Sequence, residues 1–323
     1  MNAFKLSIGD TVRVIAPSFS LRMISEEVRS IASQRFECLG LKLEFGDHVE
    51  EMNDHLSSDI KSRIDDLHAA YSDKNVKAVF AVIGGYNSNQ LLTHLDWDLI
   101  KNNPKPLIGY SDTTALQNAI FAKTGHISYS GPAYSTFGQK KYFDYTLEYF
   151  VKMLFNTNAV QIIPSETWTD DEWFLDQEKR NLKQNEGWLP IYEGRATGKI
   201  LGGNLGTFTL LFGTEYMPNL KGTILFLEDD ACEKFNEFDR LLQALIHQPD
   251  FSEVQGIVLG RFQVASEMSK EYIKELFSSR PELNKIPIIA NVDFGHTNPI
   301  ITYPIGGTAT IKVSKSGSSI VLE

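Results

Sequence analysis

The sequence of 323 residues has little of several features that mark large protein classes. It has only two cysteines, Cys38 and Cys232, which make neither a disulfide framework nor the ligand spacing of a zinc site. Its apolar runs stay well short of the roughly 18 residues of a membrane span, and its first residues lack the apolar stretch of a signal peptide. We therefore expect a cytoplasmic protein without a membrane partner.

Basic charge is also scarce. Lysine and arginine number 31 against 41 aspartates and glutamates, which gives a net charge of −10. Because nucleic-acid binding needs basic surface to displace counterions, this charge argues against a nucleic-acid partner. The sequence contains neither a phosphate-binding glycine motif nor a histidine or cysteine spacing typical of metal sites. We therefore expect no cofactor and no metal.

What is present is a regular alternation of short apolar runs and amphipathic stretches in the first half. Strands are expected at residues 11–16, 41–45, 76–83 and 106–109, and helices at 25–39, 57–71, 87–95 and 113–123. This order, with short turns, predicts an α/β fold with a mostly parallel sheet covered on both faces. The second half predicts strands at 223–227, 256–259, 286–290 and 308–313, and helices at 237–247 and 270–277.

A stretch of different character separates the two halves. Residues 165–187 carry many charges and little apolar periodicity, which is typical of a functional loop or a linker. Glycines at positions 194, 198, 202, 203 and 206 then indicate turns and close backbone approaches. We place an N-terminal domain at residues 1–165, an aromatic-rich loop at 166–190 and a C-terminal domain at 191–323.

The strongest chemical signal is Gly-Tyr-Ser-Asp-Thr at residues 109–113, between a strand and a helix. A serine on such a turn projects its hydroxyl from the edge of the sheet, beside the free N–H groups of the following helix. The Gly-x-Ser-x-Gly elbow is not matched, since Thr113 replaces the final glycine. Ser111 is therefore a candidate nucleophile, and a helix-capping serine is the alternative.

A second signal is Gly84-Gly85 at the end of another predicted strand. Glycines there let the backbone approach a ligand and present an N–H to a developing negative charge. A plain turn is the alternative.

Two further signals place an ionisable side chain after an apolar strand. Glu228 follows residues 223–227, and His296 follows residues 286–290 on a glycine turn, a setting that none of the other histidines shares. A serine nucleophile needs a base, and that base needs a carboxylate to orient it. Ser111, Glu228 and His296 would supply these three roles, although spacing alone leaves open whether they meet.

Short motifs across most of the chain resemble those of the LD-carboxypeptidase family of serine peptidases. They are Ile-Ala-Pro-Ser at 15–18, Gly-Gly at 84–85, Gly-Tyr-Ser-Asp at 109–112, Gly-Gly-Asn-Leu at 202–205, Phe-Leu-Glu-Asp at 226–229 and Phe-Gly-His at 294–296. The resemblance implies an N-terminal flavodoxin-like parallel-sheet domain and a C-terminal α/β domain with a small barrel-like sheet. It also implies a homodimer, with the triad between the two domains.

The resemblance carries site roles onto matching positions of this chain. Ser111 corresponds to the nucleophile, Glu228 to the triad acid and His296 to the base. The backbone N–H groups of Gly85 and Asp112 correspond to the oxyanion hole. Asn204, in the Gly-Gly-Asn-Leu motif, is expected to bind substrate.

The family has two main branches with different substrates. One releases the terminal D-alanine of murein tetrapeptides in cell-wall recycling. The other resembles the microcin C immunity protein, which cuts the amide-type bond between an aminoacyl group and a modified nucleotide and has aromatic loop residues that stack on the base. Because this loop carries Trp168, Trp173 and Trp188, we favour the second branch and expect Trp173 and Trp188 to bind substrate. Packing of the loop onto the body is the alternative for each tryptophan.

Other hypotheses remain open at this stage. A substrate with a charged end calls for a cation, for which Lys234 and Arg240 are candidates, although a solvated surface role is as good an interpretation for each. A non-catalytic small-molecule binding protein on the same scaffold is the alternative of another class. A third hypothesis is a nucleotide-dependent enzyme of flavodoxin-like fold, but this sequence lacks the phosphate loop that such an enzyme needs.

Overall fold

The first sheet is built mostly by the N-terminal half of the chain, in a computed structural model that describes residues 4–323. Its strands are, in spatial order, β14 (Tyr303–Ile305), β5 (Ser128–Ser130), β4 (Leu107–Gly109), β3 (Val76–Ala81), β1 (Thr11–Ile15) and β2 (Lys42–Phe45). All neighbours pair in parallel except β14, which is antiparallel to β5. Because β3 and β4 are buried on both faces, their sequences are almost entirely apolar, with Lys77 near the start of β3 as the exception.

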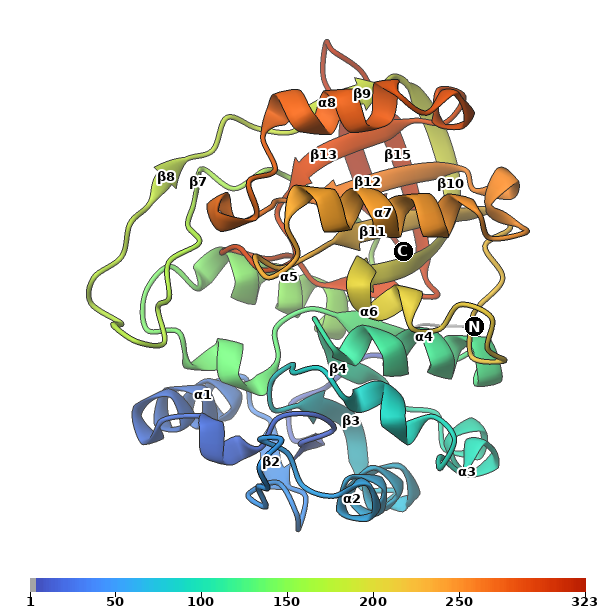
Figure 1. Cartoon of the computed structure of the whole chain (residues 1–323). Helices are drawn as coiled ribbons and strands as arrows, with labels where there is room; N and C mark the ends of the chain where they lie inside the picture. The colour runs from blue at the N-terminus through green and yellow to red at the C-terminus, as the bar shows by residue number, and fades with distance from the viewer. Residues whose placement is uncertain (1–3) are drawn as a thin grey trace.

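Helices surround this sheet at the lower part of Figure 1. They are α1 (Glu26–Cys38), α2 (Ile60–Ser72), α3 (Trp97–Asn102), α4 (Thr113–Thr124) and α5 (Asp144–Phe155). Ser25 and Asp59 cap the N-termini of α1 and α2, and Gly125 ends α4 in the left-handed conformation that glycine adopts readily. Among the described residues, no helix has the length and apolar character that a bilayer crossing requires.

The helix predicted at residues 87–95 is wrong in type and length. Only Ser88–Leu91 is helical, and it is a 3-10 turn, η2. The Asn87 side chain does not cap it, because its oxygen accepts from Ser18 Oγ at 2.9 Å and its nitrogen donates to Ser57 Oγ at 2.9 Å. The residue that could have started a longer helix instead ties three segments together.

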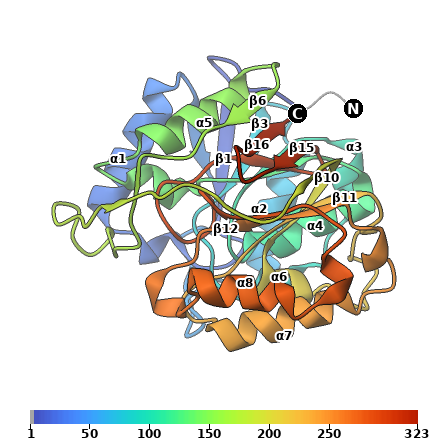
Figure 2. The ribbon, with the colours of Figure 1, turned by 90° about the horizontal axis from the view of Figure 1, so that it is seen from above.

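The second sheet contains most of the C-terminal half. Its strands are, in spatial order, β6 (Val160–Ile162), β16 (Ser319–Leu322), β15 (Thr308–Val313), β10 (Gly194–Asn204), β11 (Thr223–Glu228), β12 (Gly256–Gly260), β13 (Ile288–Val292) and β9 (Leu189–Tyr192). Strands β10 to β13 are parallel, and the flanking strands are antiparallel. Helices α6 (Leu205–Thr209), α7 (Phe235–Ile246) and α8 (Lys270–Ser278) lie on this half of the molecule (Figures 1 and 2).

This sheet curls toward a barrel. Residues of the edge strands β6 and β9 line one hollow of about 250 Å³, together with the turn between β15 and β16. The two edges therefore approach each other, although β6 and β9 do not pair. The predicted α/β class, with a parallel-sheet first domain and a C-terminal α/β domain, is confirmed.

The glycines at 194, 198, 202 and 203 lie inside β10, so the turns predicted there are wrong. The predicted close backbone approach is present. A Cβ at Gly203, where φ is +125°, would lie 2.5 Å from Thr114 Oγ1 of α4. Glycine in β10 thus lets the second sheet pack directly on the first helix after Ser111.

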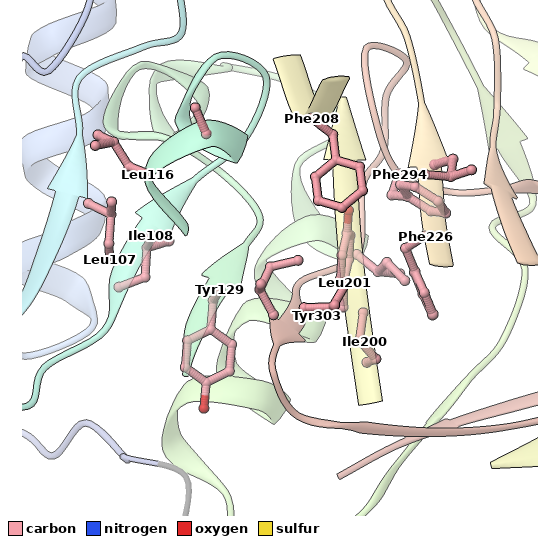
Figure 3. Packing of buried hydrophobic residues seen from close by; sticks show 14 of the residues in the cluster. Leu107, Ile108, Leu116, Tyr129, Ile200, Leu201, Phe208, Phe226, Phe294 and Tyr303 are labelled. Atoms are coloured by element: carbon pink, nitrogen blue, oxygen red, sulfur yellow. The ribbon is translucent and has the colours of Figure 1, made fainter. Parts of the chain in front are cut away.

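The two sheets exchange strands. Strand β6 precedes the predicted boundary but joins the second sheet, and β14 follows it but joins the first. Helix α4 contacts both β5 and β10. Figure 3 shows the resulting shared core, with Leu107, Ile108 and Leu116 on one side and Leu201, Phe208 and Phe226 on the other. The domain limits at 165 and 191 stay a prediction.

The segment predicted as a loop contains two short strands, β7 (Thr167–Trp168) and β8 (Lys183–Gln184), and its last residues begin β9. They pair with each other outside both sheets. In Figures 1 and 2 this segment extends to one side of the body. The remaining 3-10 turns are η1 (Leu21–Met23), η3 (Tyr134–Gly138), η4 (Phe251–Glu253), η5 (Val264–Ser266) and η6 (Pro281–Leu283).

Candidate active site

Ser111 occupies a strained turn between β4 and α4. Its φ is +62°, in the left-handed region that residues with a Cβ rarely adopt. Such strain is typical of functional positions that the surrounding structure holds in place. Room for this turn comes from Gly84, where a Cβ would lie 2.9 Å from Ser111 Cβ. The two glycine and serine motifs of the sequence therefore lie side by side.

The structure brings Ser111, His296 and Glu228 together. His296 Nε2 lies 3.0 Å from Ser111 Oγ, and His296 Nδ1 lies 2.7 Å from Glu228 Oε2. Because a carboxylate only accepts, Nδ1 carries the proton and donates to Glu228, which leaves Nε2 free to accept from the serine hydroxyl. Gly295, with φ +98°, makes this possible, because a Cβ there would lie 2.6 Å from Glu228 Oε2.

Acidic residues around His296 control its protonation. Burial by itself lowers the pKa of His296, but the charge of Glu228 and its hydrogen bond outweigh burial and, with Asp230 and Asp229, raise the pKa to about 9. Burial, followed by the charge of Glu228, also raises the pKa of the neighbouring Asp229 to about 8. Within the run Glu228-Asp229-Asp230, the carboxylate that contacts the histidine is Glu228, the residue that the sequence predicts for this role.

Two backbone N–H groups at Ser111 are without a partner. Within residues 4–323 neither Gly85 nor Asp112 donates its N–H to another protein atom. A Cβ at Gly84 would lie 3.0 Å from Ser111 Oγ and 3.6 Å from the Asp112 nitrogen. The glycine loop therefore lies next to both the serine hydroxyl and the Asp112 N–H. Free donors beside a nucleophile are what an oxyanion hole requires.

A cleft of about 510 Å³ opens next to His296. Tyr110 and His296 form part of its wall, and their rings lie 5.4 Å apart. Trp173 and Phe174 of the long loop line the same cleft, together with residues of the first half such as Phe19. The loop and both sheets thus contribute to one cavity.

Buried polar contacts hold the long loop against the histidine turn. Thr169 and Asn298 exchange two backbone hydrogen bonds of 2.8 Å. Asp293, fully buried, accepts from both the N–H and the hydroxyl of Ser165 at 2.9 Å and forms an ion pair with Arg261 at 3.1 Å. The loop therefore ends on the same segment that carries His296.

Other sequence-predicted residues are placed away from the cleft or are already engaged. Trp188 lines the hollow between β6 and β9. The Asn204 side chain caps α6 by accepting from Thr207 N–H at 2.9 Å, and it donates to Asp229 Oδ1 at 2.7 Å. Lys234 pairs with Glu267 and Arg240 with Glu237, both on the surface. The contacts of Trp188 and Asn204 with substrate stay a prediction, without support from this geometry.

Trp168 packs between Lys183 of the loop and Arg261, which follows β12. Its ring lies 4.5 Å from Lys183 Nζ and 5.0 Å from the Arg261 guanidinium carbon.

Across residues 4–323, no group of three or more histidine, cysteine, aspartate or glutamate side chains is arranged to hold a metal ion.

Comparison with known proteins decides the family. Residues 12–131 match the LD-carboxypeptidase N-terminal domain, and residues 197–311 match the LD-carboxypeptidase C-terminal domain. The chain belongs to the LD-carboxypeptidase family of serine peptidases. It is therefore a serine-type hydrolase, and this membership contradicts the alternative of a non-catalytic binding protein.

Individual relatives cover the whole chain. YocD of Bacillus subtilis, which carries a provisional carboxypeptidase name, is 48% identical over 100% of this chain and 99% of its own length. The crystal structure of an MccF-like protein from Bacillus anthracis has a TM-score of 0.98 and 51% identity, covering 100% of this chain and 99% of that one. MccF in complex with glutamyl sulfamoyl guanosine has a TM-score of 0.89 and 30% identity, covering 99% and 98%. A curated sequence of MccF, the microcin C7 self-immunity protein, comes from Escherichia coli and is 32% identical over 98% of this chain and 95% of its own length.

Proposed function

We propose that Ser111, His296 and Glu228 act as nucleophile, base and orienting acid in hydrolysis of an amide-type bond. Ser111 Oγ attacks the carbonyl carbon while His296 Nε2 takes its proton, and the histidine then returns this proton to the leaving nitrogen as the bond to carbon breaks. Water, deprotonated by His296, releases the acyl group from Ser111. The contacts of 3.0 and 2.7 Å support this sequence of proton transfers.

We assign the oxyanion of the tetrahedral intermediate to the Gly85 and Asp112 N–H groups. Both lie at the strained Ser111 turn and are free of protein partners within the described chain. Because these donors are already oriented, they need no reorganisation when negative charge develops on the carbonyl oxygen.

The substrate we propose is an aminoacyl group joined to a modified nucleotide, which makes the protein a resistance factor against microcin C-like toxins. The observation that carries this proposal is the position of Trp173, which lines the same 510 Å³ cleft as His296. An indole ring there offers a face on which a nucleobase can stack. The likeness to MccF, solved with glutamyl sulfamoyl guanosine, supports the same ligand class.

Release of D-alanine from murein tetrapeptides is the second candidate. The matches of both halves to LD-carboxypeptidase domains favour it, because that family name describes peptide cleavage. A free peptide end would occupy the cleft without requiring a stacking partner.

A paired assay separates the two substrates. Purified protein and its Ser111→Ala variant are incubated with glutamyl sulfamoyl adenosine in one tube and a murein tetrapeptide in another, and products are followed by mass spectrometry. We expect serine-dependent cleavage of the nucleotide conjugate. D-alanine release alone would favour the murein reaction, and turnover unaffected by Ser111→Ala would contradict the assignment of the nucleophile.

The cytoplasmic location and the homodimer stay predictions. Light scattering of the purified protein would check the homodimer.

A further inference from the structure

Arg63, which no sequence signal marked, is a buried arginine of α2 beneath the glycine loop. It is only 3% exposed. Its Nη1 donates to the Pro17 carbonyl at 3.2 Å and to the Asn87 carbonyl and side-chain oxygen at 3.1 and 3.0 Å. Its Nη2 donates to Gln90 Oε1 at 2.9 Å. One guanidinium thus joins the turn after β1, at Pro17, to the segment that follows Gly84-Gly85.

The contacts continue from Arg63 to both oxyanion donors. Ser18, next to Pro17, donates to Asn87 Oδ1 at 2.9 Å and accepts the Tyr86 N–H at 3.1 Å, which fixes the residue after Gly85. Ser88, next to Asn87, donates its N–H to Asp112 Oδ2 at 2.8 Å and its hydroxyl to the Asp112 carbonyl at 2.7 Å. The loop that carries the Gly85 N–H is therefore tied to the residue that carries the Asp112 N–H.

The charge of Arg63 is unusual because its acceptors are all neutral. Every hydrogen bond that it donates within residues 4–323 ends on a carbonyl or an amide oxygen, and it forms no ion pair there. Burying an unpaired cation is costly, so neutral or anionic groups close by must stabilise it. The charges of Asp112 and Asp59, both beyond ion-pair distance, act on it. A negative charge developing at the adjacent oxyanion hole would do the same.

We propose that Arg63 is the positioning residue of the oxyanion hole: it holds the Gly85 N–H in line with the Asp112 N–H, and its positive charge favours the tetrahedral oxyanion. This inference rests on the proposed function of Ser111. Arg63 acts through the loop and does not touch the reacting atoms. Its loss should therefore weaken the transition state and leave substrate binding and the base unaffected.

A serine-directed fluorophosphonate tests this without knowledge of the natural substrate. Ser111 Oγ attacks phosphorus, fluoride leaves, and the phosphonyl oxygen occupies the oxyanion hole. We expect Arg63→Met to slow labelling by about 100-fold, the cost of a reacting geometry misplaced by about 1 Å. Arg63→Lys, which keeps the charge but not the fork, should fall between Arg63→Met and wild type. The apparent pKa of the labelling rate should be unchanged.

Arg280→Met is the matched control. Arg280 is also a buried arginine, 8% exposed, but it pairs with Asp239 in the other half of the molecule. Its loss should lower stability and leave the labelling rate of the folded protein unchanged. Labelling of Arg63→Met at the wild-type rate, or an equal slowing in Arg280→Met, would overturn the role of Arg63. Wild-type protein that is not labelled at Ser111 would instead overturn the proposed function. If Arg63→Met does not fold, the labelling rate of Arg63→Lys is the test. A wild-type rate in Arg63→Lys would contradict the proposal that the hydrogen bonds of Arg63 hold the Gly85 N–H in position.

Discussion

At the scale of single residues, the charge of Glu228 sets the pH at which His296 can act as a base. Burial lowers the pKa of His296, and Glu228 reverses this and raises it well above the usual value for histidine. Because the base must be unprotonated, kcat/KM should rise with pH through the alkaline range. Glu228→Gln removes the charge, so the rise of kcat/KM with pH should shift to lower pH. In this variant kcat should also fall on the order of 1,000- to 10,000-fold. Profiles of kcat/KM against pH measure both effects.

Asp229→Asn is the control for this shift. Asp229 is buried beside Glu228, but its carboxylate binds the Gly206 and Asp230 N–H groups and Asn204 rather than the histidine. Its charge acts on His296 less strongly than that of Glu228. In Asp229→Asn the rise of kcat/KM with pH should therefore shift less than in Glu228→Gln. An equal or larger movement would show that the carboxylates titrate as one unit, and no movement in either variant would contradict the role of Glu228.

Single residues also show what sequence can and cannot predict. Ser111 and His296 could be named because each follows an apolar strand on a glycine-bearing turn, a pattern with a mechanical reason. Asn204, expected to bind substrate, lies beside Asp229, but its side chain caps α6 and holds Asp229, so its contact with substrate stays a prediction. Sequence gives the neighbourhood of a residue, whereas the direction of its side chain depends on tertiary packing. Arg63 gave no signal, because an arginine on a helix is usually solvated.

At the scale of elements, the long loop supplies an aromatic wall to the cleft. Trp173→Ala should raise KM for glutamyl sulfamoyl adenosine by about 5- to 150-fold, which corresponds to a stacking energy of about 1–3 kcal/mol. The rate of fluorophosphonate labelling should change little, because this probe carries no nucleobase that could stack on the ring. Trp188→Ala is the matched control, since Trp188 lines the hollow between β6 and β9. Equal effects on KM in both variants would contradict stacking at Trp173.

Strand β10 makes a different demand on its residues. At Gly203 φ is +125° and a Cβ would press on Thr114 Oγ1. Gly203→Ala should therefore lower the free energy of unfolding by about 1–3 kcal/mol or more. Denaturant unfolding measures this, and Gly213→Ala, where a Cβ would have open space despite a positive φ, serves as the comparison. A smaller loss at Gly203 than at Gly213 would mean that α4 and β10 adjust freely.

The same strand shows why element prediction failed in the middle of the chain. Glycines every few residues are typical of turns, and only the pairing of β10 with β11 and β15 makes them part of a strand. Edge-to-edge partners of this kind come from distant sequence, so local propensity cannot predict them. The parallel strands β3, β4, β11 and β12 were predictable because burial on both faces favours a run in which most residues are apolar.

At the scale of the whole molecule, the exchange of β6 and β14 joins the two halves into one unfolding unit. The first sheet loses its antiparallel edge without β14, and the second loses its edge without β6. Helix α4, which begins directly after Asp112, packs between the sheets and shares their core. The active site lies across this junction, because Ser111 comes from the first sheet and Glu228 and His296 from the second. Assembly of the triad thus requires that both sheets be folded at once.

We therefore expect urea unfolding to show a single transition, with coincident curves from far-ultraviolet circular dichroism and tryptophan fluorescence. Residues 1–165 expressed alone should fail to fold cooperatively, because β5 would keep an unpaired edge and the core face of α4 would lose β10. Addition of residues 166–323 in trans is the control, since it restores both partners. Two separated transitions, or a cooperative fold of the isolated fragment, would show that the halves are independent domains. The distance from Ser111 to His296 would then depend on how the domains move rather than on one shared core.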